Sequence, residues 1–171
     1  MVNNDDSVDF LLMLEKYGLS IFKIFVNGQL IDIEISPIFN CAYFELIEAL
    51  LKIVNEQKET ECFLYDEPTR VGIKMGFSKI GSKNNRIHIK INSFEELYET
   101  FISIKQHSKE PKESKLMVEF TMGKNELLIK MYFQLKKIFC LLKDKEYSKD
   151  RGKYFPFEEY KRFENKMLEI I

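Results

Sequence analysis

Cysteine and histidine, the residue types best suited to nucleophilic or metal chemistry, are few in this chain: three cysteines and two histidines. Cys62 and His88 could pair if their strands were neighbours, but a catalytic thiol needs a base and a group that orients the base. No orienting residue is indicated, and cysteine often packs as a small hydrophobe. We therefore expect a buried thiol and a surface histidine. His88 and His107 lack the spacing of metal ligands, so we predict no metal site and no cofactor.

Paired acidic residues could perform acid–base chemistry, but their positions here indicate structural roles. Glu95-Glu96 and Glu158-Glu159 fall in the first turns of predicted helices, where the helix dipole favours negative charge. Asp66-Glu67 beside Arg70 is typical of a turn with a surface ion pair, and such pairs contribute little to stability.

Motifs of the common enzyme classes are absent from the sequence. There is no GxGxxG, no Walker loop, no GxSxG and no DxDxDG element. An enzyme or small-ligand-binding protein, with a site in a cleft near His88, Cys62 and Asp66, is therefore the alternative hypothesis to a non-catalytic binding protein.

Charge and composition limit the partners. The 26 basic and 27 acidic residues leave a net charge of −1, which gives no long-range field toward nucleic acid or an anionic membrane. The most apolar run, 127–142, contains three lysines and is no membrane span. The cysteines are odd in number and far apart, as in a reduced cytoplasmic protein. The polar, acidic residues 1–9 show no signal peptide.

Residues 20–36 have the clearest local pattern, a β-hairpin turned at Asn27-Gly28. These two residue types tolerate the positive φ of a type I′ turn. A two-residue turn fixes the register, so alternation should leave one face almost wholly apolar. The other face should carry these cross-strand pairs: Lys23 with Asp32, Phe25 with Leu30, and Ile21 with Glu34.

Hydrophobic periodicity and turn residues predict the remaining elements. We expect one domain over 1–171, of the α+β class, with a mainly antiparallel sheet of five or six strands built from hairpins, helices on one face and long C-terminal helices. Residues 1–8 should be a disordered lead-in, and 106–115 and 143–154 mobile loops. Helices are expected at 8–17, 38–55, 94–106 (with a Ser93/Glu96 capping box), 123–143 and 157–169, and further strands at 61–66, 71–77, 87–91 and 116–120.

Helix 123–143 is apolar over most of its surface apart from a narrow polar stripe. Such a helix is either central and covered on several sides, or it uses a partner. The first interpretation is favoured because tertiary packing is the usual fate of this pattern. The second predicts a homodimer, so the chain is expected to be a monomer or a homodimer.

The solvent face of the predicted sheet is the candidate binding surface. Gly72 and Gly76 share a strand face with Arg70 and Lys74, and a strand glycine often marks a bulge or the close approach of another backbone. A basic half and an acidic half, with apolar residues between charges, have the mixed character of a protein interface. A plain solvated face with cross-strand ion pairs is the alternative. The candidate residues are Lys23, Phe25, Leu30, Asp32, Glu34, Lys74, Arg86, His88 and Lys90.

The layout resembles small bacterial α+β proteins of unknown function, including some immunity proteins encoded beside polymorphic toxins. The features that carry the resemblance are the hairpin Phe22 to Ile35 followed by an aromatic helix, the second hairpin ending in Ile87 to Ile91, and the C-terminal helix after Phe155-Pro156. A tryptophan expected in some relatives is absent. The resemblance implies a non-catalytic protein that binds and blocks one protein partner.

Overall fold

The computed structural model describes residues 7–38, 40–66, 71–81, 85–95 and 114–171. It has an α+β fold with two antiparallel sheets, which confirms the predicted fold class. The elements are β1 (Val8–Leu14), η1 (Lys16–Gly18), β2 (Ser20–Val26), β3 (Gln29–Ile35), α1 (Ala42–Val54), β4 (Glu59–Asp66), β5 (Val71–Ile80), β6 (Arg86–Glu95), β7 (Ser114–Gly123), α3 (Lys124–Leu141), α4 (Lys145–Ser148), η2 (Gly152–Tyr154) and α5 (Phe157–Leu168).

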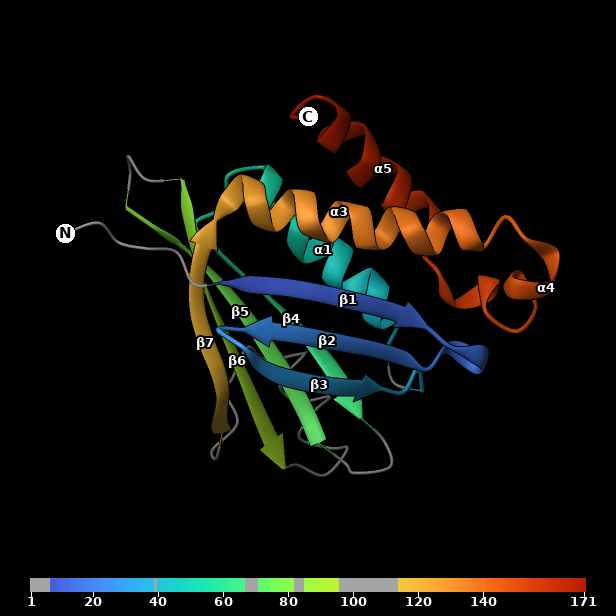
Figure 1. The fold of residues 1–171 in the computed structure, drawn as a ribbon, viewed down its shortest axis with the longest axis horizontal. Helices are drawn as coiled ribbons and strands as arrows, with labels where there is room; N and C mark the ends of the chain where they lie inside the picture. Colours follow the sequence, from blue (N-terminus) through green and yellow to red (C-terminus); the bar gives the residue numbers. More distant parts are fainter. Residues whose placement is uncertain (1–6, 39, 67–70, 82–84, 96–113) are drawn as a thin grey trace.

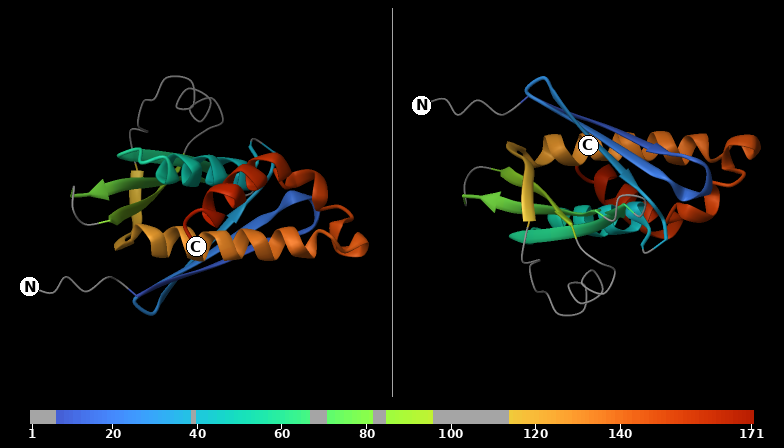
Figure 2. Two further views of the ribbon diagram at one scale, coloured as in Figure 1. Left: turned by 90° about the horizontal axis from the view of Figure 1, so that it is seen from above. Right: turned by 90° about the horizontal axis from the view of Figure 1, so that it is seen from below.

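The strands divide between a first sheet, in the order β1-β2-β3, and a second sheet, in the order β4-β5-β6-β7, instead of forming one sheet. In Figure 1 the first sheet lies in front of the second, and the strands of the two sheets cross steeply. In the view from above (Figure 2, left), α5 lies between α1 and α3. Helix α1 packs on β4, α3 packs on β1, and α5 contacts both α1 and α3.

The predicted hairpin has the predicted register. Asn27 and Gly28 have φ values of 49° and 83°, as a type I′ turn requires. Phe22 pairs with Ile33 and both are buried, so one face of the hairpin belongs to the core as expected.

The helix predicted at 8–17 is wrong. Residues 8–14 form β1, which pairs with β2 so that Leu12 faces Phe22. Alternate residues are buried, namely Val8, Phe10, Leu12 and Leu14. The run from Phe10 to Leu14 is apolar throughout, so it fits a helix face and a strand equally well, and only pairing with β2 decides between them.

The second sheet contains the strands expected at 61–66, 71–77, 87–91 and 116–120, each extended at one or both ends. Ser93 pairs with Ile73 and so lies in a strand, not in a helix cap. The helix expected at 94–106 therefore does not begin at residue 94; Glu96, His107 and the rest of that segment lie outside the described residues. Strand pairing on both sides of β6 outweighs the local capping pattern.

The predicted C-terminal helices are present as α3 and α5. Helix α3 buries a row of residues against β1, β7 and α5, which agrees with the central-helix interpretation, while Phe133 remains 54% exposed. The segment 143–154, expected as a mobile loop, contains α4 and η2. It is tied to the end of β1, because Tyr147 Oη and Arg151 Nε both donate to the Leu14 carbonyl at 3.1 Å.

Candidate functional site

The outer face of the first sheet, which we define by nine residues, points away from the core. Strand register places these residues in three cross-strand rows. Phe25 and Leu30 are 39% and 50% exposed, and they stand opposite each other. The rows are Asp9–Phe25–Leu30, Leu11–Lys23–Asp32 and Met13–Ile21–Glu34.

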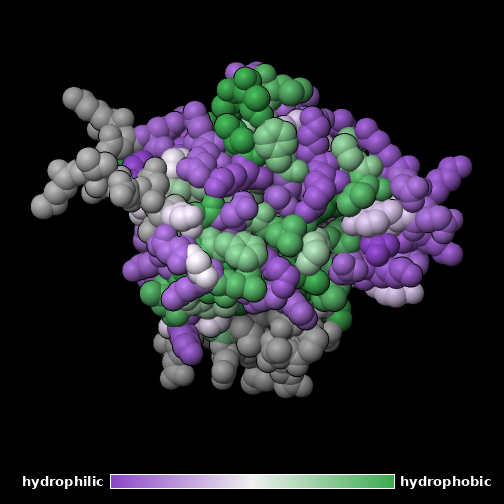
Figure 3. Space-filling model, in the orientation of Figure 1, coloured by the Kyte–Doolittle hydropathy of each residue, from purple (hydrophilic) through white to green (hydrophobic). Residues whose placement is uncertain are grey.

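Apolar and charged residues are mixed on this face. Leu11, Met13 and Ile21 are half-buried around the exposed Phe25 and Leu30. In the orientation of Figure 1, the space-filling view of Figure 3 shows hydrophobic residues in the middle of the molecule, interspersed with hydrophilic ones. Side chains of this mixed kind are characteristic of protein interfaces.

Negative charge predominates on the outer face of the first sheet. Lys23 Nζ forms an ion pair with Asp32 Oδ2 across the hairpin, as the predicted register requires. Asp9 and Glu34 are exposed, so the face carries three carboxylates against one ammonium group. An exposed ion pair contributes little to stability, so the charges of this face matter more for choosing a partner than for folding.

The remaining candidate residues lie on the second sheet, so the prediction of one surface with a basic and an acidic half is wrong. Acidic neighbours on flanking strands balance the basic residues. Lys74 Nζ lies 2.9 Å from Glu61 Oε2, and His88 Nε2 lies 3.6 Å from Glu119 Oε2. Arg86 donates to the Thr121 hydroxyl at 2.8 Å. Lys90 is exposed and stands opposite Glu119.

The two strand glycines of β5 have different surroundings. A Cβ atom on Gly72 would lie 2.2 Å from the ring of Phe94, which is buried together with Tyr65. Gly72 thus leaves room for an aromatic side chain, and not for a bulge or another backbone, the two roles expected from the sequence. Gly76 has no atom closer than 3.8 Å to such a Cβ. It lies in a groove of about 550 Å³ whose lining includes Glu61, Lys74, Ser78, His88 and Lys90.

Cys62 and His88 do not form a site. Cys62 is fully buried on the inner side of β4, and burial raises the pKa of its thiol far above the ordinary value. His88 is on the outer side of β6, beside Ser78 and Thr121. The expected buried thiol is confirmed. The side chain of Asp66, with Glu67 and Arg70, lies outside the described part of the chain. Glu158 and Glu159 lie in the first turn of α5, as predicted.

Among the residues that the structure describes, no three His, Cys, Asp or Glu side chains come together in a group that could hold a metal ion. Within the same residues, no helix is long and apolar enough to cross a membrane.

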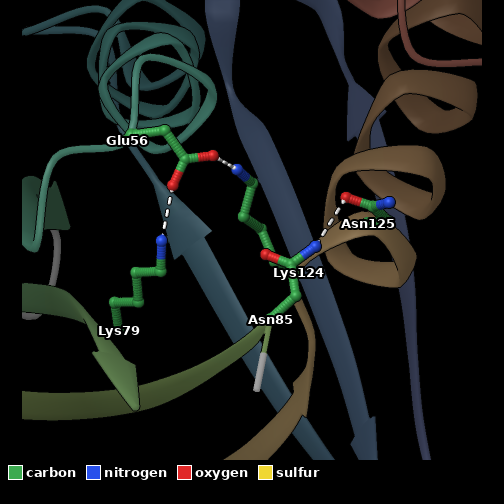
Figure 4. A network of polar contacts seen from close by, with 5 residues as sticks. All are labelled: Glu56, Lys79, Asn85, Lys124 and Asn125. Carbon is green, nitrogen blue, oxygen red and sulfur yellow. Dashed lines mark hydrogen bonds and ion pairs between the residues drawn. The ribbon is translucent and has the colours of Figure 1, made fainter. Parts of the chain in front are cut away.

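A polar network that the sequence did not reveal joins the turn after α1 to β5 and α3 (Figure 4). The Glu56 carboxylate accepts from Lys124 Nζ and, at 2.6 Å, from Lys79 Nζ. These two hydrogen bonds lower the pKa of Glu56 to about 2. Lys124 is 6% exposed, and its backbone N–H donates to the Asn85 carbonyl at 2.7 Å. The three charged residues are far apart in the sequence, and no local pattern signals their contact.

The β1 residues of the outer face, Asp9, Leu11 and Met13, were also missed, because the segment was interpreted as a helix. Apart from Val8-Asp9-Phe10 the segment has no polar–apolar alternation, so the sequence carried no clear signal for the two faces of this strand. Comparison with protein-family models, with curated proteins and with solved structures found no match to this chain.

Proposed function

We propose that this protein is a non-catalytic protein-binding module whose contact surface is the outer face of the first sheet. The observation that carries the proposal is the exposed Phe25–Leu30 pair, surrounded by half-buried apolar residues and by carboxylates. Binding energy at interfaces concentrates on a few residues, and aromatic side chains are enriched among them. Blocking one partner, in the manner of immunity proteins, is the finer form of this proposal and rests on the resemblance in layout.

The outer face of the second sheet supports binding less well. Lys74 and His88 face Glu61 and Glu119, the aromatic residues Phe94 and Tyr65 are buried, and Phe63 is half-buried beneath Lys74. A protein partner would have to replace existing ion pairs there, which brings little net gain. On the first sheet, by contrast, a partner would remove exposed apolar surface from water.

The test is affinity capture with the tagged protein from a lysate of its own cells, comparing wild type with a Phe25→Ala/Leu30→Ala double variant. We expect one stoichiometric protein partner with the wild type and its loss with the double variant, at unchanged thermal stability. A Lys74→Ala/Lys90→Ala variant on the second sheet is the matched control and should retain the partner. Retention by the double variant, or loss only with the control, would contradict the proposal.

A second candidate function is binding of a small polar molecule in the groove over Gly76. The open space above this glycine, among Lys74, Ser78, His88 and Lys90, favours it. Gly76→Val would fill the floor of the groove while keeping the strand. Metabolites retained by the wild type and released from this variant would support the second candidate, and equal retention by both would contradict it.

A further inference from the structure

The free edge of β3 presents the backbone of residues that also belong to the outer face of the first sheet. A type I′ turn closes on a hydrogen-bonded pair, here Val26 with Gln29, and antiparallel pairing alternates from there. Gln29, Ile31, Ile33 and Ile35 therefore bond to β2. The N–H and C=O groups of the intervening residues, Leu30, Asp32 and Glu34, point away from β2 toward the edge.

The opposite edge of the sheet, on β1, is covered. Helix α3 runs along it (Figure 1) and supplies hydrogen-bond partners to its backbone. Leu12 N donates to Gln134 Oε1 at 3.2 Å, and Lys130 Nζ donates to the Val8 carbonyl. Phe10 N donates to Asp9 Oδ1 at 2.9 Å. An uncovered strand edge is a template for pairing with another chain, and proteins commonly cover such edges.

The β3 edge has no such cover in the part of the chain that the structure describes. No hydrogen bond from those residues reaches the edge-facing backbone of Leu30, Asp32 or Glu34. The first backbone hydrogen bond to the second sheet follows the strand, where Ser36 N donates to the Tyr65 carbonyl at 3.1 Å. With respect to these described residues, the β3 edge is therefore open from the turn to Glu34.

The charge of the outer face indicates which kind of strand could pair with the β3 edge. Asp32 and Glu34 project from this edge on the outer face, which already carries more carboxylates than ammonium groups. Opposite charges in cross-strand positions are favourable and like charges are unfavourable. A second copy of β3 would add further carboxylates to the same face. A strand with basic residues at alternate positions would neutralise them, and its intervening apolar residues would lie on the side of Ile31 and Ile33.

We infer that β3 is a docking edge, at which an extended segment of a protein partner, basic at alternate positions and apolar between them, adds a fourth strand to the first sheet. Strand addition provides affinity through main-chain hydrogen bonds and specificity through alternate side chains. This inference rests on the proposed function, since it names how the partner of the same surface binds.

The first test is amide hydrogen exchange by NMR, with a short blocked peptide of alternating lysine and valine as the probe. We expect the peptide to slow exchange at Leu30, Asp32 and Glu34, whereas Ile31 and Ile33 are already protected by β2. A peptide of alternating glutamate and valine is the control and should leave exchange unchanged. The inference would be overturned if the lysine peptide gave no protection, or if it did not slow exchange at Leu30, Asp32 and Glu34 in particular. Equal effects of the lysine and glutamate peptides would overturn it as well.

The second test separates backbone pairing from charge with the variants Asp32→Ala and Asp32→Pro. Both remove the carboxylate, but only proline removes the edge-facing N–H, and it leaves the bonds to β2 in place. We expect Asp32→Pro to bind the lysine peptide about tenfold more weakly than Asp32→Ala, the effect of one lost hydrogen bond. Equal binding by the two variants would overturn strand addition. If Asp32→Pro fails to fold, the wild-type exchange pattern decides.

Failure of the two proposals is distinguishable in the affinity capture. A partner lost with Phe25→Ala/Leu30→Ala but held equally by Asp32→Ala and Asp32→Pro would leave the contact face in place and overturn strand addition. A partner that is retained equally by the wild type and by all of these variants would overturn both proposals.

Discussion

On the second sheet, Phe94 lies across Gly72 and basic side chains meet carboxylates of neighbouring strands, whereas on the first sheet Phe25 and Leu30 stay exposed beside unbalanced carboxylates. The two edges of the first sheet differ in the same way, because α3 covers β1 while no described residue bonds to the outward-facing backbone of β3. The comparison shows that two faces built from similar strands differ in how far neighbouring side chains of the same sheet satisfy them: the basic and aromatic residues around Gly72 have partners within the second sheet, whereas Phe25 and Leu30 do not lose their exposure to any described residue. This difference is what singles out the outer face of the first sheet.

The largest expected effect concerns the packing of the second sheet. Gly72→Ala should reduce the free energy of unfolding by about 1–3 kcal/mol, because its Cβ would overlap the buried Phe94 ring. Gly76→Ala is the matched control, with open space above it, and should leave stability unchanged or raise it by up to about 1 kcal/mol. Urea unfolding of both variants measures the difference. Equal changes in the free energy of unfolding for the two variants would contradict the close contact of Phe94 with Gly72.

The next effect sharpens the comparison of the two edges. Gln134→Ala should lower the free energy of unfolding by about 1–2 kcal/mol, since the N–H of buried Leu12 loses its acceptor. Gln134→Glu keeps an acceptor and should lose less. On the open edge, Glu34→Ala should change stability by less than about 0.5 kcal/mol, as for other surface substitutions. Thermal or urea unfolding measures the free energy of unfolding of all three variants. A loss of stability in Glu34→Ala as large as that in Gln134→Ala would contradict the difference between the two edges.

The smallest effect is a pH dependence from the network at Glu56. The pKa of this carboxyl is about 2 in the folded protein against an ordinary value of 4.5. The unfolded chain therefore binds more protons between these values, so the contribution of Glu56 is present above pH 4.5 and disappears as the pH falls toward 2. Because the side chain is 57% exposed, the contribution should stay below about 1 kcal/mol.

The check on this prediction is urea unfolding of wild type and Glu56→Gln across that acidic range. The difference in stability between the two proteins should shrink as the pH falls. Glu59→Gln, at the start of β4, controls for the loss of one carboxylate. A wild-type advantage that stays constant down to pH 2 would contradict the assigned pKa.

Much of the fold could be predicted, but less of the candidate site. The hairpin residues Lys23, Phe25, Leu30, Asp32 and Glu34 were placed correctly on one exposed face, because turn chemistry and alternation act over short distances. The sequence did not predict that β1 is the third strand of this sheet, nor that α3 covers the β1 edge while the β3 edge has no cover among the described residues. Lys74, Arg86, His88 and Lys90 were assigned to the same surface, since nothing in a sequence states which strands share a sheet.

The sequence by itself determined the register at Asn27-Gly28, the amphipathic helices α1 and α5, and the alternation of the strands after residue 59, all of which depend on residues close together in the chain. Only the tertiary structure decided that residues 8–14 form a strand, that Phe94 covers Gly72, and that Glu56 meets Lys124. These outcomes depend on contacts between residues far apart in sequence. Such contacts leave no periodic pattern along the chain, and their free energies outweigh local propensity.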